Sequence, residues 1–232
     1  MKKEYEILYE DKDILVVNKP AGLLVHKVEG KDEETLADLL VKDYPELKSV
    51  GDKPERPGII HRLDKFVSGV MVVARTQEAF DFMKAQFKER RMKKEYIALV
   101  HGHMPRPVDT IKLKIARSRE KARMVARPEG QEGRDAVTHY EVTDTFKNYD
   151  LLRVQIETGR THQIRVHMHA LGHPLVGDPL YKIKRIKSKE LADRVFLHAA
   201  KLTLTMPSGE TKTFEAPMPE ELVNFLPTLA RT

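Results

Sequence analysis

The residues from Gly58 to Ala74 constrain the fold of this chain more than any other stretch. Their second half, Val70–Ala74, is short, largely β-branched and bounded by Gly69 and Arg75, which is the pattern of a buried strand. The turn just before this strand holds the charged or polar side chains His61, Arg62, Asp64 and Lys65. A carboxylate whose cationic neighbours oppose its protonation is a candidate reactive group. An ordinary surface loop with an Arg–Asp pair has the same pattern, so the rest of the chain must decide.

Composition excludes several classes of protein. An apolar fraction of 41% over 232 residues is enough for a buried core. The absence of cysteine excludes disulfides, thiolate nucleophiles and cysteine-based zinc sites, and it suits a reducing compartment. The amino terminus has no apolar region of the signal-peptide type, and no apolar run approaches the length that spans a bilayer. We therefore expect a cytoplasmic protein without a membrane partner.

The formal net charge of +6 indicates a polyanionic partner, although many soluble proteins are basic. The positive residues are dense in two segments, Lys112–Arg127 and Lys182–Lys189. Either segment could follow a phosphate backbone, and two solvated faces would explain them equally well. The charge alone leaves RNA binding open.

Hydrophobic periodicity predicts an α+β fold. The expected strands are Ile14–Val17, Val70–Ala74, Lys94–Val100, Ile111–Ile115, Val137–Val142, Leu152–Ile156 and a hairpin of Phe196–Met206 with Thr211–Phe214. The expected helices begin at Thr35, with Asp38 completing a capping box, and cover Gln77 to about Arg91, about Thr161–Leu171 and Pro219–Leu229. No linker interrupts the pattern. We expect a mixed, largely antiparallel sheet with a few interspersed helices.

Cationic side chains gather on the expected helix near residue 165. Arg165 lies three residues after His162 and four before His169, so these three side chains share a helical face. Such a face is costly to bury without an anionic partner, and Asp64 is a plausible one.

Other chemistries find less support in the sequence. The histidines between residues 162 and 173 suggest a metal site, but Gly172 and Pro174 break the helix where His169 and His173 have ligand spacing. Histidines that bond backbone or phosphate explain the density better. No pair of facing carboxylates of the glycosidase type is evident. No P-loop or dinucleotide fingerprint is present, so we expect no nucleotide cofactor.

Four stretches, taken in order, resemble the motifs of the RluA family of RNA pseudouridine synthases. They are Val17–His26, His61–Asp64 with Ser68–Gly69, Lys93–Gly102, and Thr158–His167 with Gly172–Tyr181. The segment Leu197–Ala199 and the proline-containing tail also fit, so the resemblance covers nearly the whole chain. Four motifs in the family's order are far more specific than any one of them. The resemblance implies one catalytic domain over residues 1–232, with a mixed, largely antiparallel central sheet flanked by helices and loops, and with an active-site cleft.

The resemblance implies a role for individual residues. Asp64 is the catalytic aspartate, and Arg165 pairs with it. Arg62 enters the RNA and helps to displace the target uridine, while Tyr96 and Ile164 pack against the target base. One departure is visible, because Val67 stands where the family usually has threonine, and it puts the hydrogen bonding near Asp64 in doubt.

The implied reaction converts a uridine in a structured RNA to pseudouridine without any cofactor or metal. The target must first leave its stack, which costs a few kcal/mol. The first motif begins so early that we expect no S4 RNA-binding domain ahead of it, and we expect a monomer that recognises an rRNA or tRNA stem-loop by shape. Two alternatives remain: a catalytically inactive RNA-binding protein on the same fold, and a metal- or carboxylate-dependent hydrolase.

Overall fold

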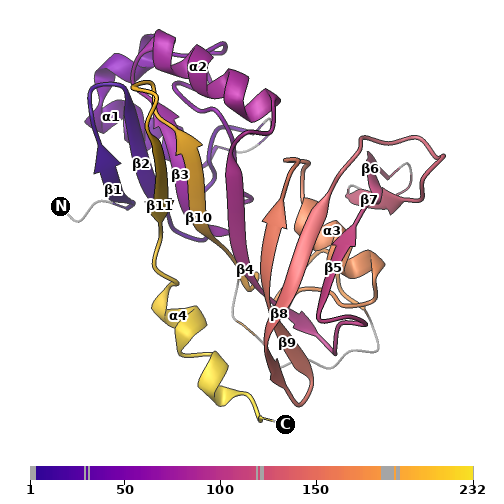
Figure 1. The fold of residues 1–232 in the computed structure, drawn as a ribbon. Helices are drawn as coiled ribbons and strands as arrows, with labels where there is room; N and C mark the ends of the chain where they lie inside the picture. Colours follow the sequence, from indigo (N-terminus) through magenta and orange to yellow (C-terminus); the bar gives the residue numbers. More distant parts are fainter. Residues whose placement is uncertain are drawn as a thin grey trace. The chain divides into compact units, whose positions relative to one another are not determined.

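A computed structural model describes residues 4–28, 30, 32–118, 120, 123–183, 191 and 194–231. The chain forms two compact units, one of Met1–Lys93 with Ala199–Pro217 and one of Lys94–His198 with Met218–Thr232 (Figure 1). Both combine helices with strands, and every strand pair of given register is antiparallel, so the predicted α+β class is confirmed. A single catalytic domain over residues 1–232 stays a prediction.

The first unit is built on a sheet with the order β1-β2-β3-β10, and β11 pairs with β10. Its strands are β1 (Glu6–Glu10), β2 (Ile14–Lys19), β3 (Ser68–Ala74), β10 (Leu197–Thr205, of which Ala199 onward belongs to this unit) and β11 (Thr211–Glu215). Its helices are α1 (Leu36–Asp43), the 3₁₀ helix η1 (Pro45–Ser49) and α2 (Gln77–Lys88). Every residue of β3 is buried, as its apolar run predicts.

The second unit is built on a sheet with the order β4-β9-β8-β5 and a separate hairpin of β6 and β7. Its strands are β4 (Lys93–His101, from Lys94 in this unit), β5 (Val108–Ile111), β6 (Lys114–Arg117), β7 (Met124–Arg127), β8 (Thr138–Phe146) and β9 (Tyr149–Ile156). Its helices are α3 (Gln163–Ala170), α4 (Glu220–Val223) and the 3₁₀ helix η2 (Leu226–Thr228). An apolar core that includes Leu99, Phe196 and Phe225 fixes the C-terminal helices to this unit.

Local sequence signals predict several elements correctly. Thr35 and Asp38 form the expected capping box, with Thr35 N donating to Asp38 Oδ2 (3.0 Å) and Asp38 N to Thr35 Oγ1 (3.3 Å). The β10–β11 hairpin has Thr205 opposite Thr211. Helix α2 ends earlier than predicted, at Lys88, because Arg90 takes a left-handed backbone conformation with φ of 59°.

Two predicted elements are wrong. The expected strand Ile111–Ile115 is divided between β5 and β6, because the Leu113 carbonyl leaves the sheet and accepts a hydrogen bond from His167 Nε2 (3.0 Å). The expected helix Pro219–Leu229 is divided between α4 and η2. A proline ring clashes with the carbonyl four residues before it, so Pro227 is incompatible with an α-helix that continues past Val223.

The predicted basic segments are covered only in part. Within Lys112–Arg127, residues 119, 121 and 122 lie outside the described residues, and the remainder includes β6 and β7. Most of Lys182–Lys189 lies outside them as well. Among the described helices, none has the length and apolar character needed to cross a membrane.

Close packing of β3 against β10 requires glycine at position 69. Gly69 has a φ of +125°, and a Cβ there would lie 2.2 Å from the carbonyl oxygen of Ala199. The Gly69→Ala variant therefore suffers both backbone strain and steric overlap. Gly209→Ala is the matched control, because Gly209 has a φ of +90° with no atom within 4 Å of the added Cβ.

We expect Gly69→Ala to lower the free energy of unfolding by about 1–3 kcal/mol more than Gly209→Ala does, as measured by urea denaturation. Equal losses in the two variants would show that the close approach of β3 and β10 contributes nothing.

Candidate active site

Asp64 lies in a turn that leads directly into β3. The turn is closed by a backbone hydrogen bond from Val67 N to the Asp64 carbonyl (3.1 Å). Val67 itself is buried, with 2% of its surface exposed. This hydrogen bond uses only backbone atoms, so the turn keeps it with valine at the position where the resemblance leads one to expect threonine.

The backbone next to Asp64 is held by the first motif. The Lys65 carbonyl accepts hydrogen bonds from Gly22 N (2.8 Å) and from the Lys19 ammonium (3.3 Å). The Lys19 side chain is fully buried, and its ammonium also donates to the carbonyls of Pro20 (2.7 Å) and Leu23 (2.8 Å). Lys19 thus joins the turn after β2 to the turn that carries Asp64.

His61 fixes the start of the same turn. Its Nε2 accepts a hydrogen bond from Val72 N (3.1 Å), and its ring stacks on Phe87 with centroids 5.9 Å apart. Because Nε2 is an acceptor here, this nitrogen carries no proton. The histidine of the His-Arg-Leu-Asp motif therefore anchors the turn to β3.

Arg62 is exposed and is oriented by His26. Arg62 Nη1 donates to His26 Nε2 (3.2 Å), while His26 Nδ1 donates to the Lys27 carbonyl (2.9 Å). Burial, with the positive charges of Arg62 and Arg56, lowers the pKa of His26 below its ordinary value. The neutral ring is the form that can accept from Arg62, so its burial and its hydrogen bonding agree.

Replacing the buried ammonium of Lys19 should loosen the Asp64 turn. In Lys19→Met the three carbonyls lose a charged donor inside the protein, and each buried acceptor left unsatisfied costs about 1–3 kcal/mol. We expect a loss of roughly 3 kcal/mol or more in unfolding free energy by urea denaturation. Lys12→Met, at an exposed position, should stay within about 0.5 kcal/mol of wild type. Similar stability of the two variants would contradict this role for Lys19.

Tyr96 and Ile164 belong to the second unit. Tyr96 lies in β4 opposite Val154 of β9 and is 8% exposed. Ile164 lies in the first turn of α3 and is 4% exposed. Each provides an apolar side chain from a rigid element, as packing against a base would require.

Arg165 forms a buried, two-pronged ion pair with Asp178. Arg165 Nε lies 2.7 Å from Asp178 Oδ2, and its Nη2 lies 2.9 Å from Oδ1. The backbone amides of Leu180 (2.9 Å) and Tyr181 (3.0 Å) also donate to Oδ1. Burial by itself opposes the ionisation of Asp178, but the hydrogen bonds and charge of Arg165 outweigh it and lower the pKa of this carboxyl.

The predicted common face of His162, Arg165 and His169 meets one aromatic ring. The rings of His162 and His169 both lie edge-on to Tyr181, with centroids 5.6 and 5.8 Å away, and the Arg165 guanidinium lies 5.1 Å from the Tyr181 centroid. His162 is not helical, however. It caps α3 in a left-handed conformation with φ of 57°, and α3 begins at Gln163 rather than at Thr161.

The sequence alone does not single out Asp178 or Lys19 as positioning groups. It does contain a signal for Asp178, because this residue lies in the same motif as Arg165 and a buried guanidinium needs a carboxylate. The predicted pairing of Arg165 with Asp64 joins residues of the two separate units and stays a prediction. Among the described residues no group of three or more His, Cys, Asp or Glu side chains could hold a metal ion.

Removing the charge of Asp178 should destabilise the second unit. Breaking a buried ion pair from one side costs about 3–5 kcal/mol, so we expect a loss of that size in unfolding free energy for Asp178→Asn. The control Asp52→Asn removes an exposed pair with Lys84, whose two side chains are 50% and 51% exposed, and it should cost at most about 1 kcal/mol.

This contribution should also depend on pH. The folded-state pKa of Asp178 lies below its unfolded value of about 3.9, so the wild-type advantage is complete above roughly pH 4 and disappears as the pH falls through the folded pKa. Denaturation curves at several pH values measure it. An advantage over Asp178→Asn that stays constant at acid pH would contradict the assignment.

Comparison with known proteins identifies the family to which the chain belongs. The model of the RNA pseudouridylate synthase family matches residues 13–170, a range that includes the Asp64 turn and α3. The chain belongs to this family. The resemblance to RluA-type enzymes seen in the sequence is thereby confirmed.

Individual relatives of the chain carry names from the same family. The chain is 48% identical to an "Uncharacterized RNA pseudouridine synthase" of Chloroflexus aurantiacus, over 88% of this chain and 63% of the relative. It is 42% identical to the "Ribosomal large subunit pseudouridine synthase D" of Neisseria meningitidis, over 97% of this chain and 61% of the relative. The chain thus spans less than two thirds of the length of these two relatives.

A solved structure also matches. The human RNA pseudouridylate synthase domain containing 4 protein is 27% identical, with a TM-score of 0.76, over 95% of this chain and 91% of that one.

Proposed function

We propose that this protein isomerises a uridine in a structured RNA to pseudouridine, with Asp64 as the catalytic carboxylate. The main support for this proposal is that the chain belongs to the RNA pseudouridylate synthase family and has Asp64 in a turn whose backbone is held by hydrogen bonds. That turn is fixed by Val67, Lys19 and Gly22 through hydrogen bonds to its backbone, and its carboxylate belongs to the motif His61–Asp64. A rigid backbone beside a reactive group is what positional catalysis requires.

The reaction needs a held carboxylate and a base that cannot escape. The N1–C1′ bond breaks, the uracil turns, and C5 joins C1′, while the hydrogen of C5 leaves to solvent and N1 gains a proton. The product is an isomer of the substrate, so no oxidant, reductant or group donor takes part. Asp64 either attacks C1′ or removes the 2′ proton by way of a glycal, and both routes require its ionised form.

The remaining site residues have separate roles in this proposal. Arg62, exposed and oriented by His26, displaces the target uridine from its stack and offsets part of the unstacking cost of a few kcal/mol. Tyr96 and Ile164 supply apolar faces for the detached base. Arg165, held by Asp178, pairs with Asp64 and positions its carboxylate.

The substrate we propose is a stem-loop of ribosomal RNA, with tRNA as the second candidate. Relatives in Neisseria meningitidis and Pseudomonas aeruginosa carry the name "Ribosomal large subunit pseudouridine synthase D", which supports the first choice. An enzyme that modifies either RNA works where that RNA is, so RNA binding and a cytoplasmic location belong to the proposal. We also propose that it acts as a monomer, which sedimentation of the purified protein tests.

The decisive test compares wild type with Asp64→Asn on total RNA from a strain that lacks the protein. Pseudouridines are mapped at nucleotide resolution by chemical derivatisation and reverse-transcription stops. We expect wild type to add at least one stop in ribosomal RNA and Asp64→Asn to add none. Asp52→Asn, an exposed change, should behave as wild type.

Two other results would be informative. If neither wild type nor Asp64→Asn adds a stop while both bind the RNA, the catalytic proposal fails and an inactive RNA-binding protein takes its place. If Asp64→Asn adds the same stops as wild type, the assignment of Asp64 is wrong.

A further inference from the structure

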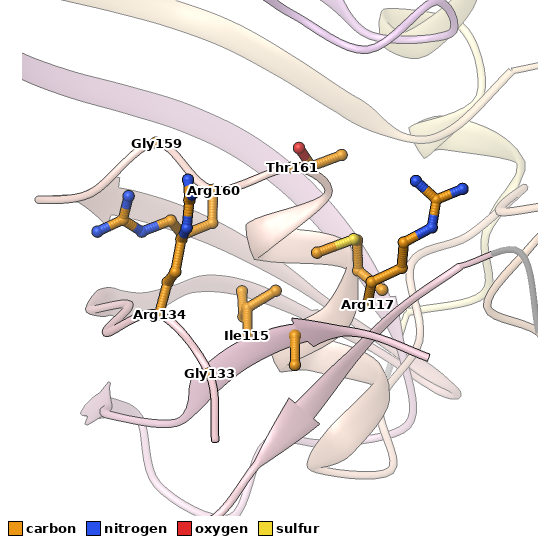
Figure 2. Close-up of a pocket in the computed structure, with 9 residues that line it drawn as sticks. Ile115, Arg117, Gly133, Arg134, Gly159, Arg160 and Thr161 are labelled. Atoms are coloured by element: carbon orange, nitrogen blue, oxygen red, sulfur yellow. The ribbon is translucent and has the colours of Figure 1, made fainter. Parts of the chain in front are cut away.

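The second unit contains a cavity of about 330 Å³ bordered by three arginines. Figure 2 shows Arg134 and Arg160 on one side of it and Arg117 on the other. Ile115 and Met124 add apolar surface, and Thr161 adds a hydroxyl. This volume lies at the lower end of the range of about 300–1,000 Å³ typical of small-molecule sites, and it greatly exceeds the roughly 30 Å³ that one water occupies.

The backbone that carries Arg117 and Arg134 is rigidly built. Ile115 N donates to the Arg134 carbonyl and Arg134 N donates to the Ile115 carbonyl, both at 2.9 Å, so residue 134 lies directly alongside β6. Side chains two residues apart on a strand point to the same face, which places Arg117 on the face of Ile115. Gly133 allows this approach, because a Cβ there would lie 2.9 Å from Lys114 Cβ.

The third arginine is fixed by a separate network. Arg160 Nε donates to the Asp135 carbonyl (3.0 Å), and Arg160 N donates to Gln163 Oε1 (3.1 Å). The Gln163 amide in turn donates to the Val137 carbonyl (2.9 Å) and to Thr138 Oγ1 (3.0 Å). The loop that borders the cavity is therefore held to the start of β8 before any ligand binds.

The charge at this cavity is unbalanced. Within the described part of the chain, neither Arg117 nor Arg134 forms an ion pair with a carboxylate. Guanidinium groups match phosphate geometry with two parallel hydrogen bonds, and they are the preferred cation at phosphate sites. Two such groups on opposite sides of a cavity that also has apolar side chains favour a ligand that combines an anionic group with an apolar part.

We propose that this cavity binds one nucleotide of the RNA substrate, with its phosphate between Arg117 and Arg134 and its nucleoside against Ile115 and Met124. The identification of the ligand as RNA rests on the proposed function. The loop Gly159–Thr161 that borders the cavity continues directly into α3, which carries Ile164 and Arg165. None of Asp64, Tyr96 and Ile164, the residues proposed to act on the reacting uridine, borders the cavity. The nucleotide bound here is therefore a neighbour of that uridine in the substrate.

Met124 provides a direct probe, because its methyl group can be labelled with ¹³C together with those of the other methionines, nine in all. The full-length protein is titrated separately with uridine 5′-monophosphate, uridine and inorganic phosphate. We expect the Met124 signal to shift saturably with the monophosphate. Uridine or phosphate alone should bind with at least about tenfold lower affinity, since losing one hydrogen bond to a charged group lowers the affinity by more than about tenfold.

The double variant Arg117→Gln/Arg134→Gln should lose this response by at least about tenfold. The control Arg153→Gln, on an exposed part of β9 in the same unit, should keep it. Unchanged signals of the buried Met71 and Met168 show that each variant is folded. If the double variant fails this check, the charge-conserving Arg134→Lys variant, expected to keep binding, is compared with Arg134→Gln, expected to lose it.

The proposal is overturned if Met124 does not respond to the monophosphate, if the arginine variants respond as wild type does, or if uridine or phosphate alone binds as tightly. Pseudouridine formation is assayed in parallel on ribosomal RNA. Activity without a Met124 response would rule out nucleotide binding in the cavity and leave the proposed function standing. A Met124 response in a protein without activity supports the cavity as a nucleotide site while the proposed function fails.

Discussion

The second unit depends on the buried ion pair between Arg165 and the carboxylate of Asp178. This carboxylate accepts two hydrogen bonds from Arg165 and two from backbone amides, so none of its charge is left uncompensated within the protein. The same contacts fix the segment that ends at Tyr181, and the Tyr181 ring then packs on His162, which caps α3, and on His169 within α3. A short helix with unfavourable composition is held in this way by polar contacts, together with an apolar cluster that includes Val166, rather than by its own propensity.

The first unit uses the opposite charge for the same purpose. The buried ammonium of Lys19 satisfies carbonyls of two turns that lie far apart in the sequence, and one of these turns carries Asp64. In each unit a proposed site residue, Asp64 in the first and Arg165 in the second, is thus held in place with the help of a buried charged side chain. The motifs of the family therefore contain two kinds of residue, those proposed to meet the substrate and those that position them.

The sequence predicts elements whose signals are local. The capping box of Thr35, the buried run of β3 and the alternation of β10 and β11 each depend on a few neighbouring residues. It does not reveal that Asp178 is the carboxylate bound to Arg165, because choosing among several carboxylates requires the path of the chain between them. The division of Ile111–Ile115 has a similar origin, since it depends on a hydrogen bond from His167.

We propose that Asp64 performs the chemistry, whereas Asp178 only positions Arg165. Release of tritium from C5 of labelled uridine in ribosomal RNA measures the chemical step, and RNA binding is measured on the same proteins. We expect no release by Asp64→Asn, and a reduced rate with unchanged RNA affinity for folded Asp178→Asn. Release by Asp64→Asn at the wild-type rate would show that Asp64 is not the catalytic group.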